Sequence, residues 1–266
     1  MKKWLSMMMI LTLCAGLTAC GSKSDSQPGT SAAQAQTQEE TTAPDTASET
    51  AAETSEVPSS AALSYAVTEA RLEAENCHFV YPQFSNADPA ISGFYNEQWA
   101  ELARSYLQMT AKDPSRTCTV NYQIMTQSED LLSILFTGEW TIEGGAYPSA
   151  FFLTYNIDMK TGETIRLADA VDLTALSAQL AEGDFSLPSD YSYLEDYKKD
   201  LFTGSSASDI SARLEMADYE VTASEGGLTA SNQTPADFSY YNNGELRIIV
   251  YTIHALGDFA ALIPNT

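Results

Sequence analysis

The chain has 266 residues, of which 36 are acidic and 13 basic, so its formal net charge is −23 at pH 7. Nucleic acids and anionic membrane surfaces normally require a basic footprint on the protein, so this charge balance argues against both as ligands. It would attract a cationic partner, although acidity can also serve only to keep an extracellular protein soluble.

The amino terminus has the organisation of a bacterial lipoprotein signal. Lys2 and Lys3 precede an apolar run from Trp4 to Leu17, which is too short to span a bilayer. Small residues then lead to Cys20, as in a lipobox. We expect residues 1–19 to be removed and Cys20 to carry a diacylglycerol, which anchors the protein in the cell membrane, facing outside the cytoplasm. An ordinary cleaved signal and a short membrane anchor are the alternatives.

Residues 20–60 have the composition of a tether. Between Gly21 and Ser60 there is no aromatic residue, and Val57 is the only branched aliphatic one. Such a segment cannot bury enough apolar area to offset the entropy of ordering it, so we expect a disordered spacer rather than an interaction motif. Residues 61–266 remain as one folded domain, with 29 acidic and 10 basic residues and a net charge of about −19.

The first half of this domain is predicted to contain two strands and a long helix. Leu63–Tyr81 holds both strand-like pieces, the second of which ends at Pro82. Asp88 is a suitable N-cap, Pro89 suits the first helical position, and the helix should end before Asp113 and the proline after it. The apolar residues at helical spacing are expected to face the core rather than to stack on a ligand: Ile91, Phe94, Tyr95, Trp99, Leu102 and Tyr106.

The next segment reads as a meandering antiparallel sheet. Arg116–Met125 and Leu131–Ile142 are strand-like. Phe151–Asp158 and Glu163–Leu167 flank a turn in which Gly162 can adopt a positive φ, which is typical of a hairpin.

Short helices are then predicted before the chain returns to strand. Asp172 caps a helix that runs to about Ala181, Tyr191–Phe202 offers a second, and Ser208 begins a third. The closing strands are Phe238–Tyr241, Leu246–Ile253 and Ala260–Ile263. The predicted fold class is α+β, an antiparallel sheet with helices packed against it.

Two cysteines, Cys77 and Cys118, lie in strand-like stretches of the folded part. A location outside the cytoplasm permits a disulfide. It would close a loop of about 42 residues and contribute roughly 4 kcal/mol in the chain-entropy model. We favour this bridge over two buried thiols.

No catalytic or metal-binding motif is recognisable. The two histidines, His78 and His254, belong to neither an HExxH nor a paired CxxC pattern, and we interpret them as structural or surface residues. A GxSxG elbow, a phosphate-binding glycine loop and an SxxK arrangement are all missing from the sequence. We therefore predict no enzymatic activity, no cofactor and no metal.

Tyrosines and carboxylates gather in residues 184–200. Their spacing singles out neither a glycosidase pair nor a calcium loop, and the carboxylates fit a solvated helical face. Tyr191 and Tyr193, with Asp190 and Glu195 beside them, form a candidate ligand-binding surface for a basic protein or a sugar. Packing of the two tyrosines in the core is the alternative.

Three stretches together resemble a family of extracellular bacterial domains of unknown biochemical function. They are Tyr81–Ser85 with the helix after it, Gly144–Asp169, and Leu246–Pro264. Such domains form the outer part of RsiV-like anti-sigma factors, which bind lysozyme, and stand at the front of PdaC-like peptidoglycan deacetylases. The resemblance covers nearly all of residues 63–264 and implies an α+β fold and a role at the cell envelope.

The chain departs from the family pattern at Tyr147, where the family commonly has histidine. It also lacks the sigma-binding segment and transmembrane helix of the sensors and the metal-binding deacetylase domain. The resemblance therefore implies a bare domain that binds a cationic lysozyme-like protein or a cell-wall component, with Tyr147 in a candidate binding loop. An accessory envelope lipoprotein without a discrete ligand is the main alternative, and a peptidoglycan-acting enzyme is a further one.

Overall fold

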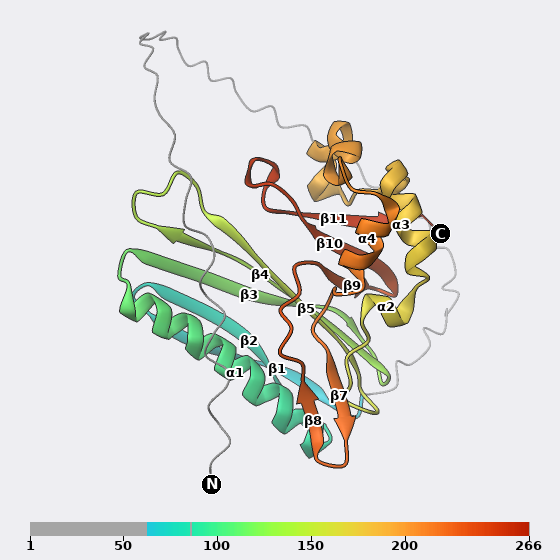
Figure 1. Cartoon of the computed structure of the whole chain (residues 1–266). Helices are drawn as coiled ribbons and strands as arrows, with labels where there is room; N and C mark the ends of the chain where they lie inside the picture. Colours follow the sequence, from blue (N-terminus) through green and yellow to red (C-terminus); the bar gives the residue numbers. More distant parts are fainter. Residues whose placement is uncertain (1–62, 86, 266) are drawn as a thin grey trace, which may run out of the picture. The chain divides into compact units, whose positions relative to one another are not determined.

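The computed structural model describes residues 63–85 and 87–265 (Figure 1). The predicted signal peptide, Cys20 and the tether lie outside these residues. The strands of the first sheet are adjacent in chain order: β1 (Ala66–Ala74), β2 (Cys77–Ser85), β3 (Arg116–Gln127), β4 (Leu131–Ile142) and β5 (Ser149–Asp158).

One strand pair of this sheet is parallel and the others are antiparallel. β2 and β3 run parallel because helix α1 (Pro89–Lys112) connects them and returns the chain to the same end of the sheet. The remaining neighbours pair antiparallel, as the meander predicted. The α+β class is confirmed, and this sheet is mixed.

Helix α1 begins and ends where the local sequence predicts. The Asp88 carboxylate accepts a hydrogen bond from the backbone N–H of Ala90 at 2.7 Å, Pro89 follows the cap, and Asp113 is the C-cap. Ile91, Tyr95, Trp99 and Ala103 are buried against the first sheet. The predicted core face is confirmed, since the other residues of the stripe are also packed against this core: Phe94, Leu102 and Tyr106.

The largest departures from the predicted strands in this half are the end of β2 and the segment after β5. β2 continues through Pro82 to Ser85, because it pairs with β1 along its whole length but with β3 only over Cys77–Phe79. A missing N–H is tolerated where a strand has only one neighbour. The segment Glu163–Leu167 is not a strand: it forms a single bridge between Thr164 and Ile157, and Leu167 starts a helix. Gly162 has the predicted positive φ, +76°.

The second half forms a smaller antiparallel sheet with helices on it. Its strands lie in the order β6 (Phe185–Ser186), β11 (Phe259–Pro264), β10 (Glu245–Tyr251) and β9 (Phe238–Asn242). The helices are α2 (Leu167–Ala170), α3 (Leu173–Glu182), α4 (Ala207–Leu214) and the 3₁₀ segments η1 (Ser189–Phe202) and η2 (His254–Leu256).

The helix signals of this half are confirmed in part. Asp172 caps α3 as predicted, and its carboxylate accepts hydrogen bonds from Thr174 and Ala175. The second predicted helix is the 3₁₀ segment η1, and α4 starts one residue before Ser208 because Ser206 and Asp209 form a capping box. A hairpin of β7 (Val221–Ser224) and β8 (Gly227–Ala230) was not predicted.

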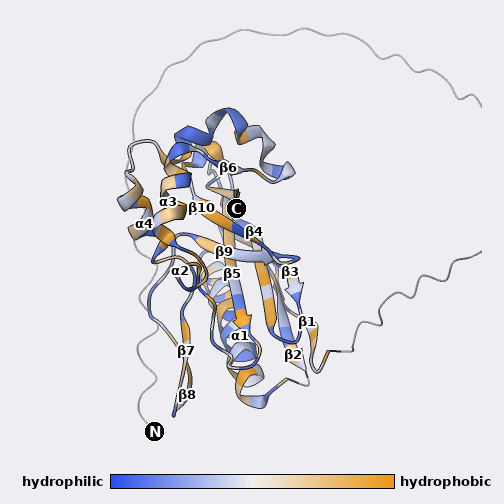
Figure 2. Ribbon diagram, turned by 90° about the vertical axis from the view of Figure 1, so that its right-hand side faces the viewer, coloured by the Kyte–Doolittle hydropathy of each residue, from blue (hydrophilic) through white to orange (hydrophobic). Residues whose placement is uncertain are grey.

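The described residues form two hydrophobic cores. The first is a largely aromatic core of α1 and the five-stranded sheet, and it also includes residues of the second sheet such as Phe238, Tyr240 and Ile249. The second lies between β10, β11 and the helices, and β10 is accordingly drawn as hydrophobic in Figure 2. Its fully buried members include Leu167, Leu180, Phe185, Leu194, Ile210 and Ile248.

Candidate functional site

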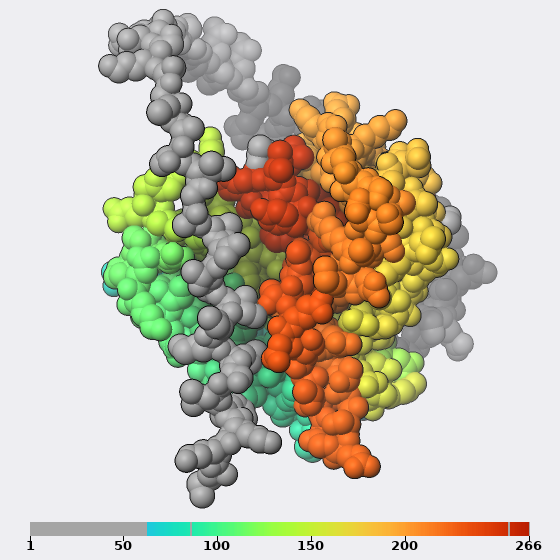
Figure 3. All heavy atoms as spheres, viewed as in Figure 1, coloured from blue at the N-terminus to red at the C-terminus, as the bar shows by residue number. Residues whose placement is uncertain are grey.

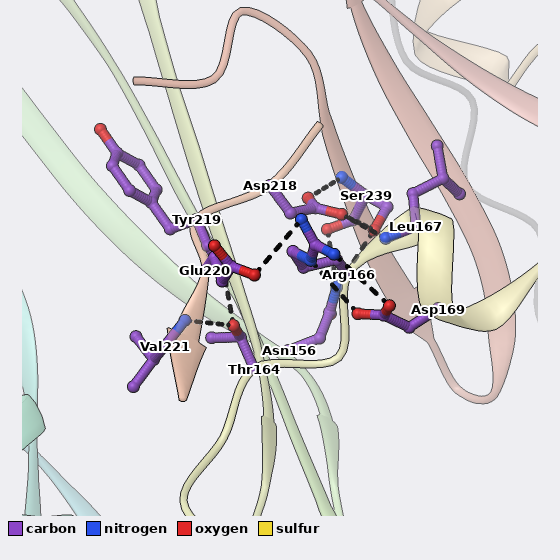
Figure 4. Close-up of polar contacts among 10 residues, drawn as sticks. All are labelled: Asn156, Thr164, Arg166, Leu167, Asp169, Asp218, Tyr219, Glu220, Val221 and Ser239. Atoms are coloured by element: carbon purple, nitrogen blue, oxygen red, sulfur yellow. Dashed lines mark hydrogen bonds and ion pairs between the residues drawn. The ribbon is translucent and has the colours of Figure 1, made fainter. Parts of the chain in front are cut away.

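A buried polar junction joins the two sheets (Figure 4). The Asn156 amide of β5 donates to the backbone carbonyl of Ser239 on β9 at 3.0 Å, and the Ser133 hydroxyl of β4 donates to the Asn156 side-chain oxygen at 2.7 Å. The backbone N–H of Tyr241 in turn donates to the Ser133 hydroxyl. These bonds hold β9 of the second sheet against β4 and β5 of the first.

Asp218 is the centre of this junction. Its carboxylate accepts from the Ser239 backbone N–H at 2.5 Å, the Ser239 hydroxyl at 2.6 Å, the Leu167 backbone N–H at 2.8 Å and the Thr154 hydroxyl at 3.3 Å. Burial raises the pKa of Asp218 to about 6, although these hydrogen bonds oppose the shift. Because the protein itself occupies the carboxylate oxygens, Asp218 is placed to hold the fold rather than a ligand.

The surroundings of Asp218 support the same interpretation. Thr164 donates to the carbonyl of Tyr219 and accepts from the N–H of Val221, each at 2.8 Å. Arg166 forms ion pairs with Asp169 at 3.2 Å and Glu220 at 3.6 Å. Figure 4 shows these contacts joining the segment before α2 to the segment before β7. No pattern in the sequence singled out Asp218, since its partners Thr154, Leu167 and Ser239 come from three separate segments.

An exposed surface surrounds the loop between β10 and β11 (residues 252–258). The ring of Tyr147, from the β4–β5 connection, lies 5.9 Å from the His254 ring. The Tyr193 hydroxyl, from η1, donates to the Leu256 carbonyl at 3.4 Å. Two of the predicted ligand-binding residues, 46 positions apart in the chain, therefore contact the same loop. Figure 3 shows this loop at the surface, beside η1.

Large side chains on and beside this loop are open to solvent. The exposed fractions are 75% for Tyr147, 58% for Tyr193, 53% for Tyr251 and 66% for Ile253. The sequence did not identify Tyr251 and Ile253 as exposed. The alternation of apolar and polar residues in a strand does not tell which face of the strand another sheet covers. We refer to Tyr147, Tyr193, Tyr251, Ile253 and the β10–β11 loop as the recognition surface.

Buried carboxylates hold both ends of the β10–β11 loop. Asp258 lies with one oxygen 2.7 Å from His254 Nδ1, and its other oxygen accepts from the Ala150 backbone N–H at 2.9 Å. Asp237 pairs with Arg213 and accepts from the Tyr251 backbone N–H at 2.8 Å. The loop is therefore tied to β5 and α4, so that less ordering entropy would be lost on binding.

A groove of about 700 Å³ lies between this loop and the β4–β5 connection. Its walls combine apolar and polar groups: Gly138, Glu139, Tyr147, Pro148, Ala150, His254, Gly257 and Asp258. Over residues 63–85 and 87–265, no group of three or more His, Cys, Asp or Glu side chains is arranged to hold a metal ion. The mixed walls suit a ligand group with an apolar body and a polar or charged end.

The other predicted ligand-binding residues, Asp190, Tyr191 and Glu195, do not line the groove. Tyr191 is half-buried, packs against both cores and stacks on Tyr193 with ring centres 6.3 Å apart. Burial raises the pKa of Tyr191. Asp190 and Glu195 are exposed on η1, where Glu195 forms an ion pair with Lys198 at 3.0 Å. Binding by these three residues stays a prediction.

The two cysteines stand directly opposite each other in the register of β2 and β3. Cys77 and Cys118 are free thiols here and are buried. Burial raises the pKa of both thiols, that of Cys118 to about 12. The register brings together the pair that the sequence suggested, and the bridge itself stays a prediction.

In the part of the chain that the structure describes, no helix is long and apolar enough to cross a membrane.

Comparison with known proteins finds similarity at the level of structure. No family model and no curated protein matches the chain. A DUF3298 family protein from Pseudomonas aeruginosa aligns with a TM-score of 0.43 and 13% identity, covering 76% of this chain and 90% of that one. A DUF3298 family member from Bacteroides fragilis aligns with a TM-score of 0.40, with the same identity and coverage. The chain is thus structurally similar, at low sequence identity, to DUF3298 proteins, the RsiV- and PdaC-like domain whose function is unknown.

Proposed function

We propose that this protein is a lipid-anchored binding domain of the cell envelope that captures a basic protein on its recognition surface. The observation that carries the proposal is the gathering of exposed rings around one braced loop. Tyr147 and Tyr193 reach the loop from different elements, and Tyr251 immediately precedes it. Exposed aromatic side chains of this kind are frequent anchors of protein interfaces.

The negative net charge of the domain favours a basic partner. Residues 61–266 carry about −19, Glu139 lines the groove beside Tyr147, and Asp190 and Glu195 are exposed on η1, the element that also carries Tyr193. Complementary charge speeds encounter with a basic protein and disfavours acidic ones. The sequence resemblance to RsiV-like domains, which bind lysozyme, makes a lysozyme-like protein the first candidate.

Catalysis is not part of the proposal. The His254–Asp258 pair resembles part of a catalytic relay, but Asp258 is buried and also binds the Ala150 backbone, so the pair has a role in bracing the loop. The DUF3298 structures supply no activity that could be transferred to this groove.

The proposed location depends on Cys20. Replacing Cys20 with serine removes the thiol that receives the lipid and should release the protein from the membrane fraction. Western blots of fractionated cells would measure this release. Unchanged membrane association of Cys20→Ser would contradict the lipid anchor.

Binding is tested by titrating the Cys20→Ser chain with hen egg-white lysozyme in a calorimeter, at low salt and at about 0.15 M salt. We expect saturable binding with a Kd in the micromolar range, about 10⁻⁶ M or tighter, that persists at the higher salt. Cytochrome c serves as a basic control protein. If lysozyme binding vanishes at about 0.15 M salt, or if lysozyme and cytochrome c bind equally well, the binding reflects only the net charge of the domain. That result would favour an accessory lipoprotein without a discrete ligand.

A further inference from the structure

We infer that the groove beside Tyr147 receives the side chain of a lysine or arginine from the basic partner. The inference rests on the proposed function and assigns a specific task to one part of the recognition surface. It starts from the lining of the groove, which combines an aromatic ring and small apolar side chains with carboxylates.

The apolar wall suits the stem of a basic side chain. Tyr147, Pro148 and Ala150 are among the residues that line the groove, and Tyr147 is 75% exposed. Lysine and arginine bury their methylene groups along apolar surface while the charged end stays near water or a carboxylate. A cation near the face of a tyrosine ring gains further from the ring quadrupole.

Of the two lining carboxylates, Glu139 is the one available to a ligand. Both oxygens of Asp258 are engaged, one by the Ala150 backbone and the other by His254. Glu139 lies on β4 with an exposed side chain. Within the described part of the chain, the Glu139 carboxylate makes neither an ion pair nor a hydrogen bond, so its charge is uncompensated at the groove.

The position of Glu139 follows from the register of the sheet. Glu139 pairs with Ala150 of β5, and Trp140 pairs with Ser149. The Asp258 bond to the Ala150 backbone therefore brings the β10–β11 loop beside the strand position that carries Glu139. The backbone positions of Glu139 and of the loop are therefore fixed by the fold before a ligand arrives, which lowers the cost of binding.

The test is an NMR titration of the Cys20→Ser chain with pentalysine of blocked termini, at about 0.15 M salt. We expect the amide signals of Glu139, Tyr147 and His254 to shift saturably. Glu139→Gln should weaken binding about fivefold, as expected for loss of one ion pair. Tyr147→Ala should weaken it about threefold, while Tyr147→Phe, which keeps the ring, should bind like the parent.

Matched controls separate the groove from the general acidity of the domain. Glu143→Gln removes the same charge from an exposed residue four positions away that does not line the groove, and should change the affinity less than about twofold. Pentalysine with acetylated side chains should not bind. Equal weakening by Glu143→Gln and Glu139→Gln, no effect of Glu139→Gln, or equal binding of the acetylated peptide would overturn the inference.

The two proposals fail in different ways. If the parent binds lysozyme but Glu139→Gln binds pentalysine as tightly as the parent does, the groove site is rejected and the proposed function remains intact. Specific pentalysine binding in the groove without any lysozyme binding would keep the groove site and reject a lysozyme-like partner.

Discussion

Asp218 and Asp258 are buried carboxylates that hold separate segments together by accepting backbone N–H groups. Both residues have left-handed backbone conformations, with φ of +67° and +69°. Aspartate tolerates this region better than most residues that carry a Cβ. At each position, aspartate therefore allows the backbone to turn sharply and also forms a hydrogen bond to a neighbouring element.

The raised pKa of Asp218 predicts a pH-dependent stability. Its folded-state pKa of about 6 exceeds its ordinary value of 3.8, so the folded state holds the proton more tightly and loses stability as the pH rises between these values. In Asp218→Asn this dependence disappears. We expect the free energy of unfolding of the parent to fall by about 1 kcal/mol relative to the variant between pH 5 and pH 8.

Urea unfolding at both pH values measures this difference. Staying at or above pH 5 keeps the protein away from its sequence pI of about 4.1. The asparagine variant carries a constant penalty from lost hydrogen bonds, which cancels in the comparison between pH values. A parent-to-variant difference that stays constant with pH, or changes in the opposite direction, would contradict the assignment.

The neighbouring tyrosines Tyr191 and Tyr193 are predicted to differ in role. Tyr191 is half-buried between the two cores, so Tyr191→Ala should lower the free energy of unfolding by about 3 kcal/mol. Tyr193 is 58% exposed, and Tyr193→Ala should cost less than about 1 kcal/mol. Chemical denaturation of both variants compares them directly. Equal destabilisation would mean that Tyr193 is also part of the core.

At the scale of elements, the turn after β5 packs between α1 and β8 in the first core. The Tyr95 hydroxyl of α1 donates to the Gly162 carbonyl at 2.8 Å. A Cβ on Gly162 would lie 2.8 Å from side-chain atoms of both Ile91 and Leu228. The turn therefore needs glycine for its backbone conformation and also for the close approach of α1 and β8.

A pair of glycine substitutions separates these two needs. Gly144 and Gly162 both have positive φ, +78° and +76°, but a Cβ on Gly144 would meet nothing within 4 Å. Gly144→Ala should cost about 1 kcal/mol from backbone strain alone. Gly162→Ala should cost about 2 kcal/mol more because of overpacking. Thermal denaturation checks both, and equal costs would show that the contacts at Gly162 yield without penalty.

The parallel pairing of β2 and β3 makes the predicted disulfide testable. Cys77 and Cys118 are opposite each other in register and buried. Protein isolated from outside the cytoplasm should resist alkylation after unfolding in denaturant and take up two alkyl groups once it is also reduced. Intact-mass measurement counts the added groups. Alkylation of both thiols under denaturing conditions without reductant would show that the pair is unbridged.

Across the whole molecule, local signals predicted the elements better than their assembly. Both ends of α1 could be predicted because a cap and two prolines act within a few residues. The β7–β8 hairpin could not, since Val221 is the only fully buried residue in it and most of its side chains are exposed. The parallel pair was missed because the order of strands in a sheet depends on contacts distant in sequence.

The candidate site shows the same division. Tyr147 was selected from the family resemblance and Tyr193 from its residue type and acidic neighbours, and both reach the β10–β11 loop. That they share a loop follows from the packing of the second sheet on β4 and β5, which no local pattern reports. The His254–Asp258 contact was missed because neither residue belongs to a catalytic or metal-binding motif.

The central claim is that the recognition surface binds a basic protein, and its most direct test is the affinity of the double variant Tyr147→Ala/Tyr193→Ala for hen egg-white lysozyme. Calorimetry at about 0.15 M salt should show a loss of at least about tenfold relative to the parent, with a closely similar melting temperature, since both side chains are exposed. Unchanged affinity in the folded double variant would contradict the account.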